Sequence, residues 1–312
     1  MRKIDRKQFL KQSGWGIAGL SFIDWLEPVE AAEQVAEWQR VRSYKPPEIA
    51  QDEQFWQTIR KQFSQDDQLI NLNNGAVSPQ PKPVQNALIE NYRQANRQPS
   101  YYYQMKLEEQ RDALRASLAE EIGSNPEEVA INRNATEGLN TIIFGLPLER
   151  GDEVVVSNYD YPYMLNAWRQ RQKRDGIKLN PVALQMLVED EEAIVQKFAN
   201  AITARTKVVH ITHMINWTGQ ILPAKKITEM AHEKGCEVIV DAAHALGHFA
   251  HSFAAIGCDY YAASLHKWMC APFGTGMLAV KNDKIAKLWP LLSSYDPKSD
   301  DIRKFEISRS RL

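Results

Sequence analysis

Reactive side chains follow short apolar segments of the chain. Lys267 comes three residues after the small and aromatic run 260–264, and Asp241 ends the apolar run 237–241. Burying a free ammonium is costly, whereas a lysine whose amine forms a Schiff base carries no such charge. A buried carboxylate likewise needs a positive partner, and a protonated ring nitrogen would serve as one. Taken singly, Lys267 is equally consistent with a side chain that reaches solvent, and Asp241 with a helix cap or a structural ion pair.

Two more candidate positions follow predicted strands. Residues 135–137 open a predicted helix, where the hydroxyl of Thr136 suits the N-terminus and the exposed amides attract a phosphate group. Tyr161 lies four residues after the strand that ends at Ser157, where its ring could stack on a flat cofactor. Ordinary helix capping and a surface aromatic are the alternative interpretations of Thr136 and Tyr161.

Two motifs are rejected as ligand sites. His244 and His248 are four residues apart, as on a metal-binding helix, but no His-Glu-x-x-His motif and no completing carboxylate or thiolate is present. Residues 14–19 match the dinucleotide motif G-x-G-x-x-G, but the charged segment before them has no strand pattern, which that motif requires. We therefore expect neither a metal site nor a nicotinamide site.

An alternating α/β framework is needed to bring these residues together. Apolar segments predict strands at 129–132, 153–157, 207–212, 237–240, 260–264 and 276–280, and helical patterns between them include 136–144, 162–175 and 224–234. One long helical pattern covers about 82–122. The alternation predicts a mostly parallel sheet with helices on both faces, and in such sheets ligands bind beyond the carboxyl ends of the strands.

Length, charge and cysteine usage narrow the class of protein. The 312 residues suggest one large domain and a smaller one, and 38 basic against 39 acidic residues give a net charge of -1. This balance gives no support to nucleic-acid binding, which depends on a basic surface. Three widely spaced cysteines argue against a disulfide framework and a zinc site, and no run of 18 apolar residues is present to span a membrane.

In chain order, these motifs resemble the class V aminotransferase family of enzymes of fold type I, which use pyridoxal 5'-phosphate (PLP). The likeness runs from about residue 71 to 292, in a family that includes cysteine desulfurases, kynureninase, serine–glyoxylate aminotransferases and isopenicillin N epimerase. Leu-Asn-Asn-Gly at 72–75 and Asn-Arg-Asn-Ala-Thr-Glu at 132–137 are most similar to the isopenicillin N epimerase-like branch. The resemblance implies an α/β fold whose large domain has a mostly parallel sheet sandwiched by helices, with PLP as the cofactor.

The resemblance also implies roles for individual residues. Lys267 would be the catalytic lysine that forms the Schiff base, and Asp241 the partner of the pyridine nitrogen of PLP. His244 and Asn216 would lie near the phenolic oxygen, and Tyr161 would stack on the ring. The residues that match the phosphate contacts of the family are Ala135, Thr136, Ser264 and His266.

The sequence departs from the family in two respects. Tyr161 stands where desulfurases usually have a stacking histidine, and tyrosine lacks the acid–base capacity of histidine near neutral pH. The chain ends at Leu312, about where the small C-terminal domain begins in the family, so this domain is expected to be largely missing. The small domain normally supplies the arginine that grips the substrate carboxylate and the nucleophilic cysteine of desulfurases, and Cys270 does not match that cysteine.

The predicted organisation has four parts. Residues 1–32 have the basic, apolar, small-residue order of an export signal, with Lys7 where a twin-arginine signal has its second arginine. A periplasmic or otherwise exported location is expected, with the cytoplasm as the alternative. Residues 33–75 form an N-terminal arm, 76–292 the PLP-binding large domain and 293–312 the start of the truncated small domain.

The expected function is that of a PLP-dependent enzyme that acts on the amino group or the α-carbon of an amino acid through Lys267. Its partners would be an amino-acid substrate and a second copy of the chain in a homodimer. Two alternatives stay open at this point. The chain could be a truncated PLP-binding fragment without turnover, or a cysteine desulfurase-like lyase.

Overall fold

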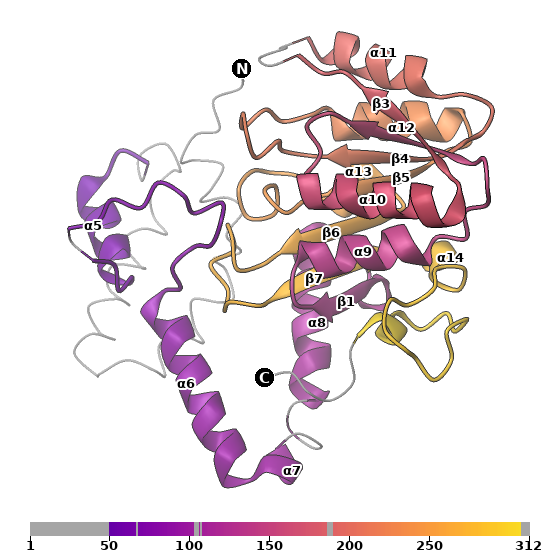
Figure 1. The fold of residues 1–312 in the computed structure, drawn as a ribbon. Helices are drawn as coiled ribbons and strands as arrows, with labels where there is room; N and C mark the ends of the chain where they lie inside the picture. The colour runs from indigo at the N-terminus through magenta and orange to yellow at the C-terminus, as the bar shows by residue number, and fades with distance from the viewer. Residues whose placement is uncertain (1–49, 67, 103–105, 107, 186–189, 307–312) are drawn as a thin grey trace.

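In the described part of the chain, a seven-stranded sheet forms the centre of the molecule (Figure 1). The computed structural model describes residues 50–66, 68–102, 106, 108–185 and 190–306; the predicted export signal at 1–32 and the arm before residue 50 lie outside them. The strands run in the order β1 (Val129–Asn132), β7 (Gly276–Val280), β6 (Tyr260–Ser264), β5 (Glu237–Asp241), β4 (Thr206–Thr212), β2 (Glu153–Ser157) and β3 (Lys178–Val182). β7 is antiparallel to β1 and β6 and the other pairs are parallel, which confirms the mostly parallel sheet.

Helices cover both faces of the sheet (Figure 1). One face carries α9 (Ala135–Gly145) and α10 (Pro162–Asp175). The other face carries α8 (Glu108–Ile122), α11 (Glu191–Ala201), α12 (Ala224–Glu233) and α13 (Phe253–Ile256). Side chains of the strands alternate between the two apolar layers, because successive residues of a strand point to opposite faces. Polar groups are therefore concentrated where the strands end.

The prediction of one long helix over about 82–122 is wrong. α6 (Lys82–Arg97) ends at Gln98, whose φ of -142° and ψ of 60° are not helical, and the short α7 (Pro99–Tyr101) begins at Pro99. Proline has no amide hydrogen to continue a helix, and it disfavours the helical conformation of the residue before it. Figure 1 shows α6 and α8 running in different directions on either side of this break.

The sequence pattern does not reveal β3 and α11. β3 is the edge strand next to β2, and it carries the exposed Lys178 and Pro181 in place of an apolar run. Proline is tolerated at a sheet edge, where no neighbouring strand needs its missing N–H. The other predicted strands and helices of the layered region agree with the structure to within one residue. The remaining short elements are α5 (Glu53–Lys61), η3 (Pro126–Glu128), α14 (Asn282–Ile285) and η4 (Ile302–Phe305).

Residues near the end of the described chain cover the outer edge of β1. η4 packs beside β1, and the carboxylate of Glu306 accepts a hydrogen bond from the backbone N–H of Ile131 at 2.8 Å. The same carboxylate pairs with Arg111 at 2.7 Å and with Arg115. These contacts satisfy an edge amide that would otherwise be open to another strand.

Asp160 joins the carboxyl ends of β2 and β4. Its buried carboxylate accepts hydrogen bonds from the backbone N–H of Ser157 at 2.7 Å and from the backbone N–H and hydroxyl of Thr212 at 3.3 and 2.8 Å. These bonds hold the segment that leads into Tyr161 against the neighbouring strand. Asp160 therefore anchors one side of the sheet edge at which ligands are expected.

Replacing Asp160 by alanine removes the acceptor of three buried donors. We expect the free energy of unfolding to fall by roughly 3 kcal/mol, because each unpaired buried donor costs about 1 kcal/mol or more. Urea unfolding followed by circular dichroism measures this loss. Asp190→Ala is the matched control, since Asp190 also accepts from two backbone N–H groups but is exposed at the start of α11. The free energy of unfolding of this control should fall by only about 1 kcal/mol. Equal decreases in the two variants would contradict the role of Asp160.

Candidate functional site

Lys267 lies in the loop after β6, at the carboxyl edge of the parallel strands. Its Nζ is 3.1 Å from Nε2 of His244, which follows β5. Burial lowers the pKa of the Lys267 ammonium, and the negative charge of Asp241 opposes this effect only in part. An ammonium that gives up its proton more readily leaves more of the free amine, which is the form that acts as a nucleophile or as a base. Lys267 is thus prepared for either chemistry.

His244 is held as a neutral imidazole. Burial is the main cause that lowers its pKa from 6.5 to about 4, and the charges of Lys267 and His248 contribute less. Nε2 of the neutral ring shares a hydrogen bond with Nζ of Lys267. His248 stacks on the indole of Trp268, with ring centroids 3.7 Å apart, and so packs the residue that follows Lys267.

Asp241 ends β5 as a buried carboxylate, 3% exposed. One oxygen accepts a hydrogen bond from the backbone N–H of Ala243 at 2.9 Å, and no cation of the described residues forms an ion pair with the carboxylate. Burial raises its pKa, against the opposing influence of His210 and Lys267. Because an uncompensated buried charge is costly, the protonated ring nitrogen of PLP fits this position.

The N-terminus of α9 forms the other end of the candidate site. The side chain of Asn134 caps this helix by accepting from the N–H of Glu137 at 2.8 Å, whereas Thr136, the capping residue considered from the sequence, is exposed. The N–H of Ala135 donates to Oγ of Ser264 at 2.9 Å and ties α9 to the end of β6. A helix start next to exposed and buried hydroxyl groups fits a phosphate group.

His266 and Gly276 shape the same end of the site. Nδ1 of His266 donates to the carbonyl of Thr275 at 2.9 Å, which leaves Nε2 for a ligand. A Cβ at Gly276 would lie 2.5 Å from backbone atoms of Asn134, so a glycine is required where β7 passes the start of α9. Gly276 is not identified from the sequence, because a close approach between segments far apart in the chain leaves no local pattern.

Tyr161 and Asn216 form no hydrogen bond or ring contact with Lys267 or His244 in the described part of the chain. The ring of Tyr161 is 36% exposed before α10, with its centroid 5.4 Å from that of Tyr163. Burial raises the pKa of its hydroxyl, with smaller contributions from Tyr163 and Asp241. Asn216 is exposed after β4, and its side chain forms no hydrogen bond with another candidate residue in the described part of the chain. A hydrogen bond thus joins Lys267 to His244, and within the described ranges no hydrogen bond joins Tyr161 or Asn216 to either of them.

The loop 71–78 packs over His244. A Cβ at Gly75 would lie 2.8 Å from Cε1 of His244 and 3.4 Å from the side chain of Trp268. The loop backbone is therefore so close to His244 that a side chain at position 75 would clash with the imidazole. The backbone N–H of Ser78 donates to the carbonyl of His266 at 3.0 Å and fastens this loop beside Lys267. The motif at 72–75 therefore marks a contact with the site that the sequence pattern alone does not show.

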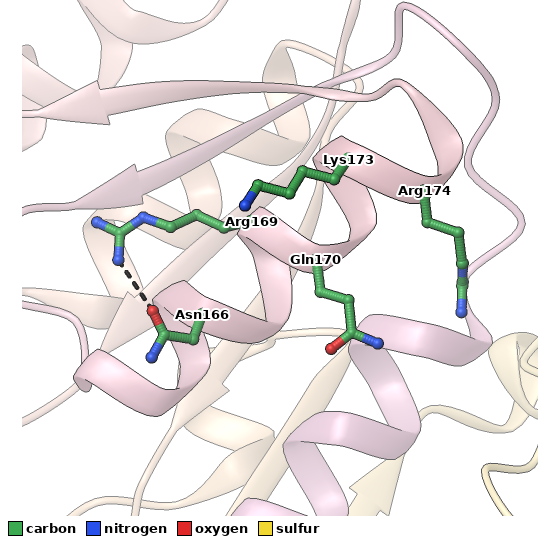
Figure 2. A pocket seen from close by; sticks show the side chains of 5 residues that line it. All are labelled: Asn166, Arg169, Gln170, Lys173 and Arg174. Atoms are coloured by element: carbon green, nitrogen blue, oxygen red, sulfur yellow. Dashed lines mark hydrogen bonds between the residues drawn. The ribbon is translucent and has the colours of Figure 1, made fainter.

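A surface hollow on α10 offers cationic side chains but no nucleophile. Figure 2 shows the residues that line it, which are Asn166, Arg169, Gln170, Lys173 and Arg174. Arg169 donates to the side chain of Asn166 at 3.1 Å, and Arg174 pairs with Asp175. Another hollow is lined by residues 98–101. Neither contains a residue of the Lys267 cluster, so the candidate site is the cluster at the strand ends.

A metal site requires a cluster of ligating side chains, and a membrane span requires a long apolar helix. Across them, no group of three or more His, Cys, Asp or Glu side chains is placed to hold a metal ion. None of the helices in the same ranges is both long and apolar enough to cross a membrane. The three cysteines are free thiols, with Cys236 and Cys258 buried and Cys270 partly buried.

Comparisons with known proteins agree with the geometry. The family model described as Aminotransferase class-V matches residues 70–299. Isopenicillin N epimerase of Streptomyces clavuligerus is 30% identical over 244 residues, which are 78% of this chain and 61% of the relative. A probable cysteine desulfurase of Synechocystis sp. is 30% identical over 246 residues, which are 75% of this chain and 58% of the relative. The chain thus spans about three fifths of the length of these curated relatives.

Solved structures share the fold. The cystine C-S lyase C-DES in complex with cysteine persulfide has a TM-score of 0.72 and 23% identity, covering 76% of this chain and 67% of that one. A C-DES variant with glycine covalently linked to the PLP cofactor has a TM-score of 0.74 and 23% identity, covering 80% of this chain and 69% of that one. These matches confirm the predicted fold, and together with the family match over residues 70–299 they confirm PLP as the cofactor.

One buried and one partly buried histidine at the carboxyl edge make the fold sensitive to acid. Burial lowers the pKa of His213 to about 3 and that of His244 to about 4, both from 6.5. Below pH 6.5 the unfolded chain binds protons that the folded chain does not, so the free energy of unfolding falls as the pH drops from 6.5 towards 4. Urea unfolding at several pH values across this range measures the slope. His213→Gln should reduce it by up to about 1.4 kcal/mol per pH unit, and an unchanged slope would contradict this explanation.

Proposed function

Since the chain belongs to the class V aminotransferase family of PLP-dependent enzymes, we propose that it acts on the amino group or the α-carbon of an amino acid, with Lys267 as the base. The observation that carries this proposal is the 3.1 Å contact between Nζ of Lys267 and the neutral His244, beside the buried carboxylate of Asp241. Isopenicillin N epimerase, one of the relatives, supports a reaction at the α-carbon.

The residues of the cluster fit both ends of the cofactor. Asp241 would pair with the ring nitrogen, and the start of α9 with Ser264 and His266 would bind the phosphate. His244, which contacts Lys267, would lie near the phenolic oxygen. When bound, PLP withdraws electrons from the α-carbon of an attached amino acid and makes its α-proton removable.

Lys267 moves the α-proton in this proposal. Its Nζ, whose pKa is lowered by burial, accepts the proton and can return it to the same carbon or to a neighbouring atom. His244 holds Nζ in place through the hydrogen bond to Nε2 and stays neutral at physiological pH, with a pKa of about 4. The loop 71–78 packs against the imidazole and limits its movement.

We favour chemistry of the isopenicillin N epimerase type over cysteine desulfuration. The second function has support of its own, since a probable cysteine desulfurase is equally similar in sequence to this chain at 30% identity. The presence of tyrosine at position 161 argues against cysteine desulfuration. A histidine at this position is the residue typical of desulfurases, and burial raises the pKa of the Tyr161 hydroxyl, so it exchanges no proton near neutral pH.

We also propose that the active form is a homodimer. Leu69, Ile70 and Leu72 are 67, 82 and 91% exposed, and they lie directly before or within the loop that packs on His244. Large apolar side chains exposed together are typical of a surface that another copy covers. Such an interface would border the candidate site.

Exchange of the α-proton in D2O tests the proposed chemistry. The protein reconstituted with PLP is expected to incorporate deuterium at the α-carbon of at least one member of a panel of common amino acids, as measured by NMR. Lys267→Ala should lower the exchange rate by about 100-fold or more, because a positioned base contributes at least this factor. Lys281→Ala is the matched control, since Lys281 is a partly buried lysine that follows β7 at the other edge of the sheet and donates to Gly257.

Two results would decide against the proposal. Formation of alanine from cysteine in the presence of dithiothreitol, which reduces the released sulfur to sulfide, without deuterium in any recovered substrate, would support the desulfurase function instead. Binding of PLP without exchange in any amino acid would support an inert PLP-binding protein.

A further inference from the structure

A buried aromatic pair, Trp168 and His210, lies next to the strand that ends in Asp241. His210 is in β4 and fully buried, and Thr212, two residues on, is in register with Asp241 of β5. Because side chains of a strand alternate, His210, Thr212 and Asp241 all face the layer that contains α9 and α10. Trp168 reaches His210 from α10, with the ring centroids 6.3 Å apart and the planes nearly perpendicular.

The hydrogen bond between the two rings defines the protonation of His210. The indole N–H of Trp168 donates to Nδ1 of His210 across 3.2 Å. An indole nitrogen can only donate, so Nδ1 must be the unprotonated, accepting nitrogen. The imidazole is therefore neutral and carries its proton on Nε2. A second proton on the ring would break the bond to Trp168.

Nε2 of His210 is an unpaired buried donor within the described residues. A buried polar group without a partner costs about 1–3 kcal/mol, so its presence needs an explanation. His210 lies two residues before Thr212, the register partner of Asp241, on the same face of the sheet in the neighbouring strand. The titratable groups that act on the Asp241 carboxylate are His210, Lys267 and Asp160, and of these His210 and Lys267 favour its ionised form.

We propose that His210 is a positioning residue for the cofactor: the N–H dipole at Nε2, oriented by Trp168, stabilises the ionised carboxylate of Asp241 that pairs with the ring nitrogen of PLP. This inference rests on the role of Asp241 in the proposed function. His210 touches neither the substrate nor the reacting atoms and acts through Asp241 alone. Trp168 donates to Nδ1 of His210 and thereby keeps the ring proton on Nε2.

The test compares PLP with a carbocyclic analogue that has carbon in place of the ring nitrogen. The double variant Trp168→Phe/His210→Phe replaces both polar partners by apolar rings, a change that can leave the folding free energy nearly unaltered. We expect it to bind PLP about tenfold more weakly than the wild type does, because the Asp241 carboxylate loses the stabilising N–H dipole, and to bind the analogue equally well. Fluorescence titration of the full chain with each probe gives the two dissociation constants.

Thr228→Val is the matched control. The hydroxyl of Thr228 is also buried and unpaired within the described residues, but it lies in α12 on the opposite face of the sheet. This variant should bind both probes as the wild type does. His210→Gln, which keeps an acceptor and an N–H donor, should recover most of the lost affinity for PLP. Equal weakening for both probes in the double variant, or no weakening for PLP, would overturn the inference.

Asp241→Asn separates this inference from the proposed function. The wild type should prefer PLP over the carbocyclic analogue, and Asp241→Asn should lose the preference. If Asp241→Asn keeps it, the role of Asp241 in the proposed function is wrong. If Asp241→Asn loses it while the His210 variants keep it, only the role of His210 is wrong.

Discussion

Two ionisable side chains, Asp241 and Lys267, are removed from water at the same sheet edge, and the rest of the site depends on this burial. Burial raises the pKa of Asp241 and lowers that of Lys267, so each is shifted towards its neutral form. They act on each other electrostatically, yet no ion pair joins them in the described structure. A ring cation beside Asp241 would restore the carboxylate and leave the amine of Lys267 free for chemistry.

The fold places these buried ionisable groups at one edge of the sheet. Both faces of the central strands pack in apolar layers, so polar side chains are gathered where β4, β5 and β6 end. Asp160 binds the ends of β2 and β4 together, and Ser264 ties the end of β6 to the start of α9. The loop 71–78, from the N-terminal part of the described chain, packs against His244. The side chains of the candidate site are therefore positioned by contacts between segments that are distant in the chain.

Much of the framework is predictable from the sequence because it follows from local patterns. Apolar runs that end in polar residues locate β5 with Asp241 and β6 before Lys267. Local patterns fail where a neighbour decides: Pro99 interrupts a continuous helical periodicity, and the edge strand β3 has no apolar run. The pairing of Trp168 with His210, 42 residues apart, and the fit of Gly75 against His244 leave no signal in spacing or composition. Such residues are identified only when the packed structure is known.

The most direct test of the account is the site at which the cofactor becomes attached. Borohydride reduction of the PLP-reconstituted protein, followed by peptide mapping with mass spectrometry, fixes any lysine bound to the cofactor. The account predicts a pyridoxyl group on Lys267, whose Nζ contacts His244 at 3.1 Å. A label on another lysine, or no label in a protein that binds PLP, would contradict it.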